Sequence, residues 1–280
     1  MDALILYAIP VFLLLMGAEY LAGRTQGLQL YEQRDTLANL AMGSGNVLIN
    51  LAWKSAGLAA AIAVYQYRLF DIPASAAWAW LLLLFAEDLC YYLFHRFHHE
   101  SRIGWAAHVN HHSSRHFNLA VALRQSWTTP FTGMVFWLPL PLLGFHPLMV
   151  LTQQAISLLY QFWIHTQTIG RLGPLEWVLN TPSHHRVHHG TNPEYIDRNY
   201  GGILIIWDRL FGTFAAENAP VKYGIIHQLD TFNPLRIAFH EWRALFGDLR
   251  RATGIRQAAG FLLRHPGWQP APRGQQSIRE

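Results

Sequence analysis

The sequence predicts an all-α, multi-pass membrane protein with about three spanning helices, a helical hairpin and a cytosolic, histidine-rich domain. Apolar residues make up 51% of the 280-residue chain and charged residues only 14%, well below the roughly 25% that is usual for soluble domains. The apolar residues are gathered into runs long enough to cross a bilayer. Buried helices of a large soluble domain are the alternative explanation of these runs.

Three apolar runs in the first third of the chain predict the spanning helices. They cover Ala3 to Ala22, Met42 to Tyr67 with Lys54 inside it, and Ala74 to Phe94. The first run has neither a preceding basic segment nor a small-residue cleavage site, so we expect a retained helix rather than a signal peptide. Residues 1–94 are therefore expected to form the membrane-spanning region.

Two shorter apolar stretches predict a helical hairpin within the region 95–240. Phe131 to Leu143 and Pro147 to Ile164 are each short or interrupted by proline, so a hairpin over 131–164 is favoured over two complete spans. Further on, a turn signal precedes the apolar run Ile203 to Trp207, which predicts a short strand-like segment.

The remainder of the chain has the character of a soluble protein. Residues 241–265 place apolar side chains at helical spacing among arginines, a pattern that fits either an interfacial amphipathic helix or the lid of a cytosolic domain. Residues 266–280 are rich in Pro, Gly and Gln, and we expect a flexible tail there.

The distribution of positive charge predicts the orientation in the membrane. Arg24 and Arg34 follow the first run, arginines also follow the third run and the hairpin, and the opposite side keeps little beyond Arg68. By the positive-inside rule the N-terminus lies outside and every histidine cluster faces the cytoplasm.

The net charge is only +4, and without a Lys/Arg cluster or an aromatic stacking platform we expect no nucleic-acid partner. The single Cys90 lies in an apolar run and predicts packing rather than thiol chemistry.

Clustered histidines are the strongest chemical signal in the sequence. Thirteen of the sixteen fall between His95 and His189. The pattern His-x-x-His-His occurs twice, and a third group precedes it: His108, His111 and His112; His185, His188 and His189; and His95, His98 and His99. Positions i, i+3 and i+4 share one face of a helix, and neutral imidazole is the commonest metal ligand. Seven or more converging imidazoles exceed the shell of one ion, so the sequence favours a pair of metal ions.

The ligand type narrows the chemistry. An all-imidazole site suits Fe, Zn, Cu or Ni. Zinc hydrolases need fewer histidines, and Ile103 stands where a zinc-protease helix beginning at His99 and Glu100 would place its second histidine. Two redox-active ions beside a bilayer could instead reduce O2 and attack an unactivated C–H bond of a lipid. A metal transporter is a further alternative, although its ligands are expected near the membrane midplane rather than after the spans.

The histidine spacing resembles that of the fatty acid hydroxylase and sterol desaturase superfamily of membrane di-iron oxygenases, most of all its ether-cleaving alkylglycerol monooxygenase subfamily. The resembling stretches cover roughly residues 91–270. They are Phe94–Arg96, Asn118–Gln125, Leu159–Thr166, Leu172–Glu176, Asn180–Gly190, Ile196–Gly202 and Ile205–Phe214.

The resemblance implies a di-iron site and its ligands. Carried over by position, the metal ligands are His95, His99, His108, His111, His112, His185, His188 and His189. His165 matches a further ligand position, although it could simply cap a helix. Glu100 follows His99 where the ether-cleaving enzymes have a needed acid, so we expect it to be catalytic. His98 and His184 fall outside the pattern, and we expect both to pack or to support the site.

Several polar residues near the histidine pattern are candidates for a functional role. Asp88 lies seven residues before His95 inside an apolar run, and an intramembrane carboxylate is usually functional. We expect it to orient a ligand imidazole as part of the catalytic machinery, or to pair with a neighbouring span. Four further residues could each contact a lipid headgroup or cofactor, or make only a structural hydrogen bond. They are Arg124, Asn180, Arg186 and Asn199.

By resemblance, the protein is expected to be a di-iron, O2-dependent lipid monooxygenase that could cleave alkylglycerol ethers. A sterol or fatty-acyl hydroxylase or desaturase on the same site is the first alternative, and a zinc hydrolase or a membrane metal-binding protein is more remote. The implied partners are a lipid from the bilayer and an electron donor, with tetrahydrobiopterin one candidate reductant. Animal members carry further apolar segments after the catalytic region; if those shape the lipid pocket, we expect a different substrate here.

Overall fold

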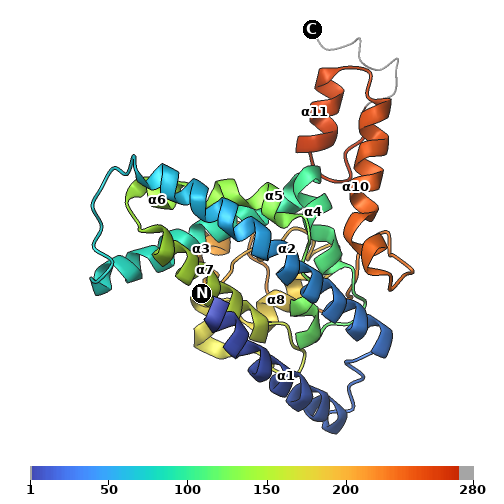
Figure 1. Cartoon of the computed structure of the whole chain (residues 1–280). Helices are drawn as coiled ribbons and strands as arrows, with labels where there is room; N and C mark the ends of the chain where they lie inside the picture. Colours follow the sequence, from blue (N-terminus) through green and yellow to red (C-terminus); the bar gives the residue numbers. More distant parts are fainter. Residues whose placement is uncertain (1, 271–280) are drawn as a thin grey trace.

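The computed structural model describes residues 2–270, and helices with connecting loops account for this part of the chain (Figure 1). Within residues 2–270 there is no strand, and β pairing is limited to two isolated bridges, Leu179 with Leu204 and Gly190 with Tyr223. The all-α expectation is therefore confirmed. The C-terminal part of the expected tail, residues 271–280, lies outside the described residues.

Three long helices match the expected spans. They are α1 (Asp2–Thr25), α2 (Gln33–Tyr65) and α3 (Ala77–Glu100), and each contains a segment long and apolar enough to cross a bilayer. Helix α2 begins nine residues before the predicted apolar run, because the Glu32 carboxylate accepts the Asp35 backbone N–H at 2.6 Å and caps the helix there. Many large apolar side chains on these helices point outward, among them Leu14 and Leu48, which are 74% and 69% exposed. Such exposure fits a lipid environment.

Helix α3 continues beyond the apolar run and carries the first histidines on its last turns. We expected the helix to end near Phe94, but it is unbroken to Glu100. Ser101 then ends α3 and caps α4 (Arg102–His112), since its hydroxyl accepts the Gly104 N–H at 3.2 Å. A Cβ on Gly104 would lie 2.6 Å from the Cα atom of His98. The glycine therefore allows α4 to fold back tightly against α3.

The expected hairpin has one broken arm and one regular arm. The first arm consists of α5 (Thr129–Gly133), the short 3-10 turn η2 (Met134–Phe136) and α6 (Pro139–Leu143). Gly144, with a φ of 116°, ends α6, and α7 (Pro147–Trp163) forms the second arm. Helix α7 packs against α1, α2 and α3.

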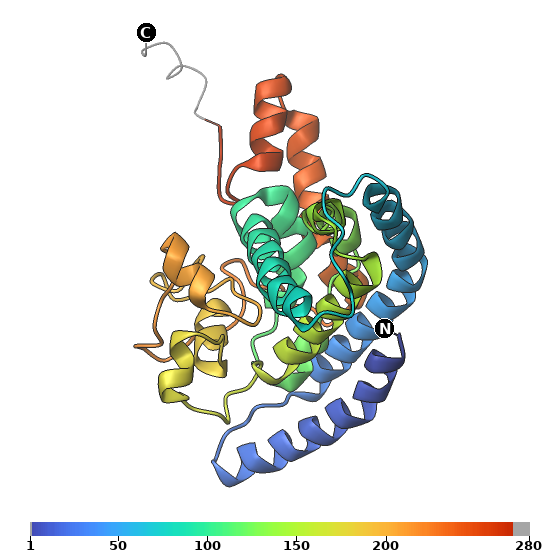
Figure 2. The same cartoon turned by 90° about the vertical axis from the view of Figure 1, so that its left-hand side faces the viewer.

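The segment after α7 folds alongside α3. It contains η3 (Gly173–Trp177), α8 (Pro182–His188) and α9 (Ile206–Phe211), and in Figure 2 this yellow and orange segment lies on the other side of α3 from α2. The strand-like expectation for residues 203–207 is wrong, because helix α9 begins at Ile206 and only Leu204 takes part in a bridge. Asp88 on α3 binds the backbone N–H groups of Ile203 and Leu204, which would otherwise be free to pair with a strand.

Two C-terminal helices form an arm that projects from the rest of the chain (Figures 1 and 2). Helix α10 (Pro234–Arg251) packs on α4 and α2, and α11 (Ile255–Leu263) lies beside it. Leu245 of α10 is buried against Ala106 of α4, so α10 covers α4. Within the expected flexible tail, Trp268 packs on Phe261 with ring centroids 5.4 Å apart, so at least this residue is anchored.

Candidate metal centre

Nine histidines converge in two buried groups. The ring nitrogens within each group lie within 4.8 Å of one another. The first group, which we call cluster A, contains His95, His99, His108, His112 and His188. The second, cluster B, contains His111, His165, His185 and His189. The nine members are the nine metal ligands predicted from the sequence, including His165.

Three helices, α3, α4 and α8, and the residues that directly follow α7 and α8 deliver these side chains to neighbouring positions. Helix α3 supplies His95 and His99 one turn apart, and α4 and α8 each divide their histidines between the two groups. The clusters are adjacent, since the rings of His112 in cluster A and His189 in cluster B stack with centroids 4.3 Å apart. A paired arrangement of this kind can hold two metal ions side by side.

Backbone carbonyl groups fix the tautomer of three of the rings. The Nδ1 atoms of His95, His165 and His188 lie 2.8, 2.7 and 3.0 Å from the carbonyl oxygens of Tyr200, Gln161 and Arg198. Because a carbonyl only accepts, each Nδ1 must carry the proton, and the neutral ring then offers the Nε2 lone pair to the cluster. Such second contacts commonly orient metal-ligating imidazoles.

The lone pairs face one another with few protons between them. The Nε2 atom of His165 lies 2.9 Å from that of His185 and 3.2 Å from that of His111. In cluster A the Nε2 atoms of His99 and His188 are buried and have no hydrogen-bond partner among residues 2–270. Buried, unpaired electron donors are costly, and a bound cation in each cluster would satisfy them. The residues present therefore fit a pair of metal ions.

The histidines beyond the spans are held in the neutral state that metal binding requires. Burial, and then the charge of neighbouring imidazoles, lower the pKa well below its ordinary value at His108, His111, His112, His185, His188 and His189. Burial lowers the pKa of His165 to about 4. These rings are uncharged near neutral pH, so their lone pairs are available to a metal.

A strained loop supplies supporting residues that the sequence analysis did not assign. Asp197 and Asn199 both have a φ of 58°, an uncommon conformation for residues other than glycine. The carbonyl group of Arg198, between these two residues, orients His188. The carbonyl group of Tyr200, which follows them, orients His95. The segment belonged to the resembling stretch 196–202, but a role for backbone carbonyls has no signal in residue identity.

The prediction that Asp88 orients a ligand imidazole is wrong. Its carboxylate accepts the N–H groups of Ile203 at 2.7 Å and Leu204 at 3.1 Å, and the Trp207 indole N–H at 3.0 Å. It therefore ties the segment that follows Tyr200 to helix α3. The Tyr200 carbonyl group, which accepts from His95, lies three residues before Ile203 in that segment.

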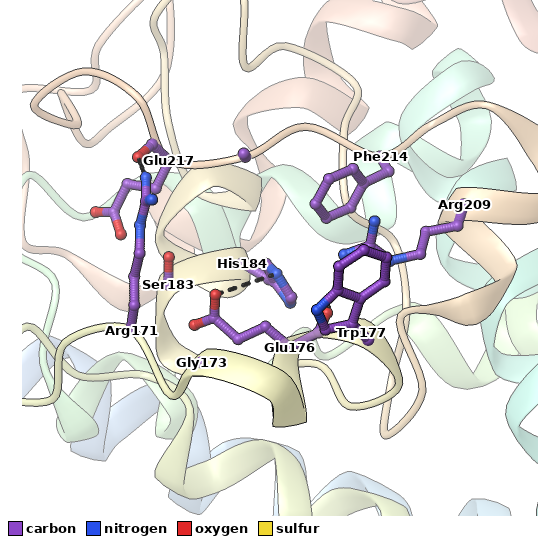
Figure 3. A pocket seen from close by; sticks show the side chains of 10 residues that line it. Arg171, Gly173, Glu176, Trp177, Ser183, His184, Arg209, Phe214 and Glu217 are labelled. Carbon is purple, nitrogen blue, oxygen red and sulfur yellow. Dashed lines mark hydrogen bonds and ion pairs between the residues drawn. The ribbon is translucent and has the colours of Figure 1, made fainter.

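Glu100 and two of the histidines lie outside both clusters. Glu100 forms an ion pair with Arg96 at 2.8 Å, and its side chain is 42% exposed, so it is not in the ligand set. His98 bonds the Phe94 carbonyl and the Thr132 hydroxyl, each at 2.7 Å, as expected of a packing residue. His184 points away from the clusters into a separate pocket (Figure 3).

The four polar residues with open roles all make structural hydrogen bonds. Arg124 joins the Asn110 carbonyl at the end of α4 to Asp35 on α2. Arg186 forms a bidentate pair with Glu217. Asn180 and Asn199 bond backbone carbonyls of Gly201 and Ala215, among others. These contacts hold the loops and helices that carry the histidines.

Comparison with known proteins agrees with this site. The fatty acid hydroxylase family model matches residues 80–213, a range that contains all nine clustered histidines. This stretch of the chain therefore matches a fatty acid hydroxylase domain. No solved structure is significantly similar to the chain.

Curated proteins similar to this chain carry names that refer to lipid substrates. The chain is 44% identical to alkylglycerol monooxygenase of Homo sapiens over 237 residues, which cover 84% of this chain and 53% of the relative. It is 43% identical to the Danio rerio protein of the same name over 266 residues, 94% of this chain and 59% of the relative. It is also 34% identical to the ornithine lipid hydroxylase OlsE of Rhizobium tropici over 124 residues, 44% of this chain and 38% of the relative. The chain thus spans between one half and three fifths of the length of the alkylglycerol monooxygenases of these two species.

Proposed function

We propose that this protein is an iron-dependent lipid monooxygenase of the membrane that cleaves alkylglycerol ethers. The observation that carries the proposal is the pair of adjacent all-imidazole clusters, with unpaired Nε2 atoms at His99 and His188. Imidazole suits several transition metals, and the family resemblance selects iron. The substrate class comes from the two alkylglycerol monooxygenases at 43–44% identity.

The proposed reaction inserts one oxygen atom into the C–H bond beside the ether oxygen. The lipid, O2, two electrons and two protons give the hydroxylated lipid and water. The product is a hemiacetal, whose C–O bond then breaks to release a fatty aldehyde and the glycerol derivative. A two-electron donor is required, and tetrahydrobiopterin is the candidate that the resemblance implies. Two bound iron ions would supply the oxidising power that no side chain has.

The residues of the chain position and shield this site. Cluster A would hold one ion and cluster B the other, with the carbonyl groups of Tyr200, Arg198 and Gln161 fixing three of the ligand rings. All the clustered histidines except His108 are buried, which keeps bulk water from the reacting centre. Glu100 is proposed to act at the edge of the site rather than as a ligand, because it is the last residue of α3 and its carboxylate pairs with Arg96.

We propose from the distribution of positive charge that the active site faces the cytoplasm. The histidine end of α3 lies on the side where Arg24, Arg34 and Arg102 also fall, which supports a cytoplasmic active site by the positive-inside rule. A lipid substrate would then approach from the cytoplasmic leaflet, with its headgroup at the level of the clusters.

The test is product formation by the purified full chain. The protein, reconstituted with ferrous iron, receives O2, a reductant and one lipid at a time from a panel of alkylglycerol, sterol and fatty-acyl lipids. The proposal predicts fatty aldehyde from the alkylglycerol alone, with one oxygen atom derived from labelled O2. His112→Ala should form none, whereas the exposed-site variant His227→Ala should match the parent. A hydroxylated or desaturated sterol or acyl product, with no aldehyde, would contradict ether cleavage but keep the oxygenase.

A further inference from the structure

A polar pocket lies on the outer side of α8, away from the histidine clusters. Its volume is about 240 Å³, and it is lined by residues of η3, α8 and the segment 209–217 (Figure 3). Helix α8 has two faces: His185 and His188 turn into the clusters, whereas His184 turns into the pocket. The pocket is therefore distinct from the candidate metal centre.

Two arginines give the pocket an excess of positive charge. Arg171 and Arg209 donate hydrogen bonds to backbone carbonyl groups, those of Glu217 and Glu176. No carboxylate within residues 2–270 forms an ion pair with either of them, since both Glu217 oxygens bond Arg186. The lining contains Arg171 and Arg209 against Glu176 and Glu217, and because Arg186, outside the lining, forms a bidentate pair with Glu217, one positive charge remains in excess.

A buried imidazole in the pocket wall has unused hydrogen-bonding capacity. His184 is only 2% exposed, and its Nδ1 atom has no hydrogen-bond partner in the described part of the chain. Its Nε2 atom lies 4.0 Å from the Glu176 carboxylate, beyond hydrogen-bonding distance. A buried polar atom without a partner is costly, and the His184 ring forms part of the pocket wall.

An exposed apolar surface borders the same pocket. We call it the η3–α9 patch, and it consists of Leu175, Trp177, Val178, Leu210 and Phe211, which are 46–70% exposed. The patch and the pocket share Trp177, and the Arg209 guanidinium lies 5.5 Å from the centre of its ring. A basic pocket with an apolar border matches the two ends of an anionic lipid.

The level of the patch along α3 places it at a membrane. Phe211 stacks on Tyr92 of α3 with ring centroids 5.3 Å apart. Tyr92 lies about 12 Å before the end of the helix at Glu100, and α3 is one of the candidate spans. The patch therefore lies beside the histidine end of a candidate spanning helix, the level at which we expect the headgroups of a bilayer.

We propose that this pocket binds the phosphate headgroup of an anionic membrane lipid, whose acyl chains lie over the η3–α9 patch. Arg171 and Arg209 would contact the phosphate, as guanidinium groups commonly do, and the His184 ring would form part of the wall beside it. The lipid would fasten the segment that carries α8, and with it three clustered histidines, to the membrane surface. The binding requires neither iron nor turnover.

Binding to the purified full chain in nonionic detergent tests the proposal. Isothermal titration calorimetry would compare dihexanoyl phosphatidic acid, dihexanoyl phosphatidylcholine and inorganic phosphate. We expect phosphatidic acid to bind about tenfold or more tightly than either of the others, because only it offers both a strongly anionic headgroup and acyl chains. Equal binding of inorganic phosphate would overturn the lipid assignment, and equal binding of phosphatidylcholine would overturn the role of the charge.

Two double variants test separately what the pocket and the patch contribute to lipid binding. Arg171→Gln/Arg209→Gln should weaken phosphatidic acid binding about tenfold or more, while Arg250→Gln, which removes a remote exposed arginine, should leave it unchanged. Leu175→Ser/Leu210→Ser should weaken binding of phosphatidic acid but not of inorganic phosphate. If the double arginine variant does not fold, Arg171→Gln alone, at an exposed loop position, should still weaken binding.

A competition experiment keeps this site separate from the proposed substrate site. A saturating alkylglycerol, which carries no phosphate, should not displace phosphatidic acid. Displacement would place the bound lipid at the substrate site and overturn the proposal, whatever the outcome of the activity tests.

Discussion

Replacing Asp88 tests how a carboxylate inside a spanning helix supports the metal site. Three buried donors depend on it, the N–H groups of Ile203, Leu204 and Trp207. A buried donor left without an acceptor costs about 1–3 kcal/mol, so Asp88→Ala should lose about 3 kcal/mol at the lower end of that range. At roughly 2–4 °C per kcal/mol, the melting temperature should fall by roughly 6–12 °C. Asp88→Asn retains one acceptor oxygen and should fall less.

The same variant should also lose iron. The segment that Asp88 holds begins three residues after Tyr200, whose carbonyl group orients His95. Thermal unfolding in detergent and iron content per chain would be measured on the same samples. Asp71→Asn is the control, because Asp71 is 86% exposed and pairs with Arg68 at the surface, where such pairs contribute at most about 1 kcal/mol. An unchanged melting temperature in Asp88→Ala, or full iron content despite a lower one, would refute this reasoning.

Three further predictions concern the clusters and their edge. His112→Ala and His188→Ala should each reduce turnover to background and lower the iron content, with membrane insertion intact; retained turnover would remove that residue from the ligand set. Glu100→Gln should lose activity while keeping its iron, because the Glu100 side chain lies outside both clusters; loss of iron would instead make Glu100 part of the metal-binding structure. Removing iron with a chelator should lower the melting temperature, and ferrous iron should restore it, since a ligand that binds only the native state stabilises that state; a melting temperature that does not respond would argue against a metal held by the folded protein.

Much of the architecture could be read from hydropathy and residue spacing. The apolar runs predicted α1, α2 and α3, because a spanning helix must be apolar over about 20 residues. The helix boundaries were less predictable. Helix α3 runs on to Glu100 because its last turns exchange lipid contacts for packing against α4 and α8, and histidines on those turns do not look apolar in the sequence.

The histidines that form the two clusters could be predicted, but the groups that orient these histidines could not. The family resemblance, rather than spacing alone, indicated which histidines converge, since His95, His98 and His99 also stand at i, i+3 and i+4 and yet His98 lies outside both clusters. The orientation of His95 and His188 depends on the carbonyl groups of Tyr200 and Arg198, and every residue carries such a group. The role predicted for Asp88 was wrong for a related reason. Its partners are backbone N–H groups more than a hundred residues away in the chain, and residue spacing does not reveal such long-range contacts.

Mössbauer spectroscopy of the purified full chain tests the central claim most directly. The protein would be reconstituted anaerobically with labelled ferrous iron, analysed for iron per chain, and measured before and after exposure to O2. Two adjacent histidine clusters predict two irons per chain and, after oxidation, the spectrum of a spin-coupled pair. A single mononuclear iron, or iron that is removed by desalting, would contradict the proposed di-iron centre.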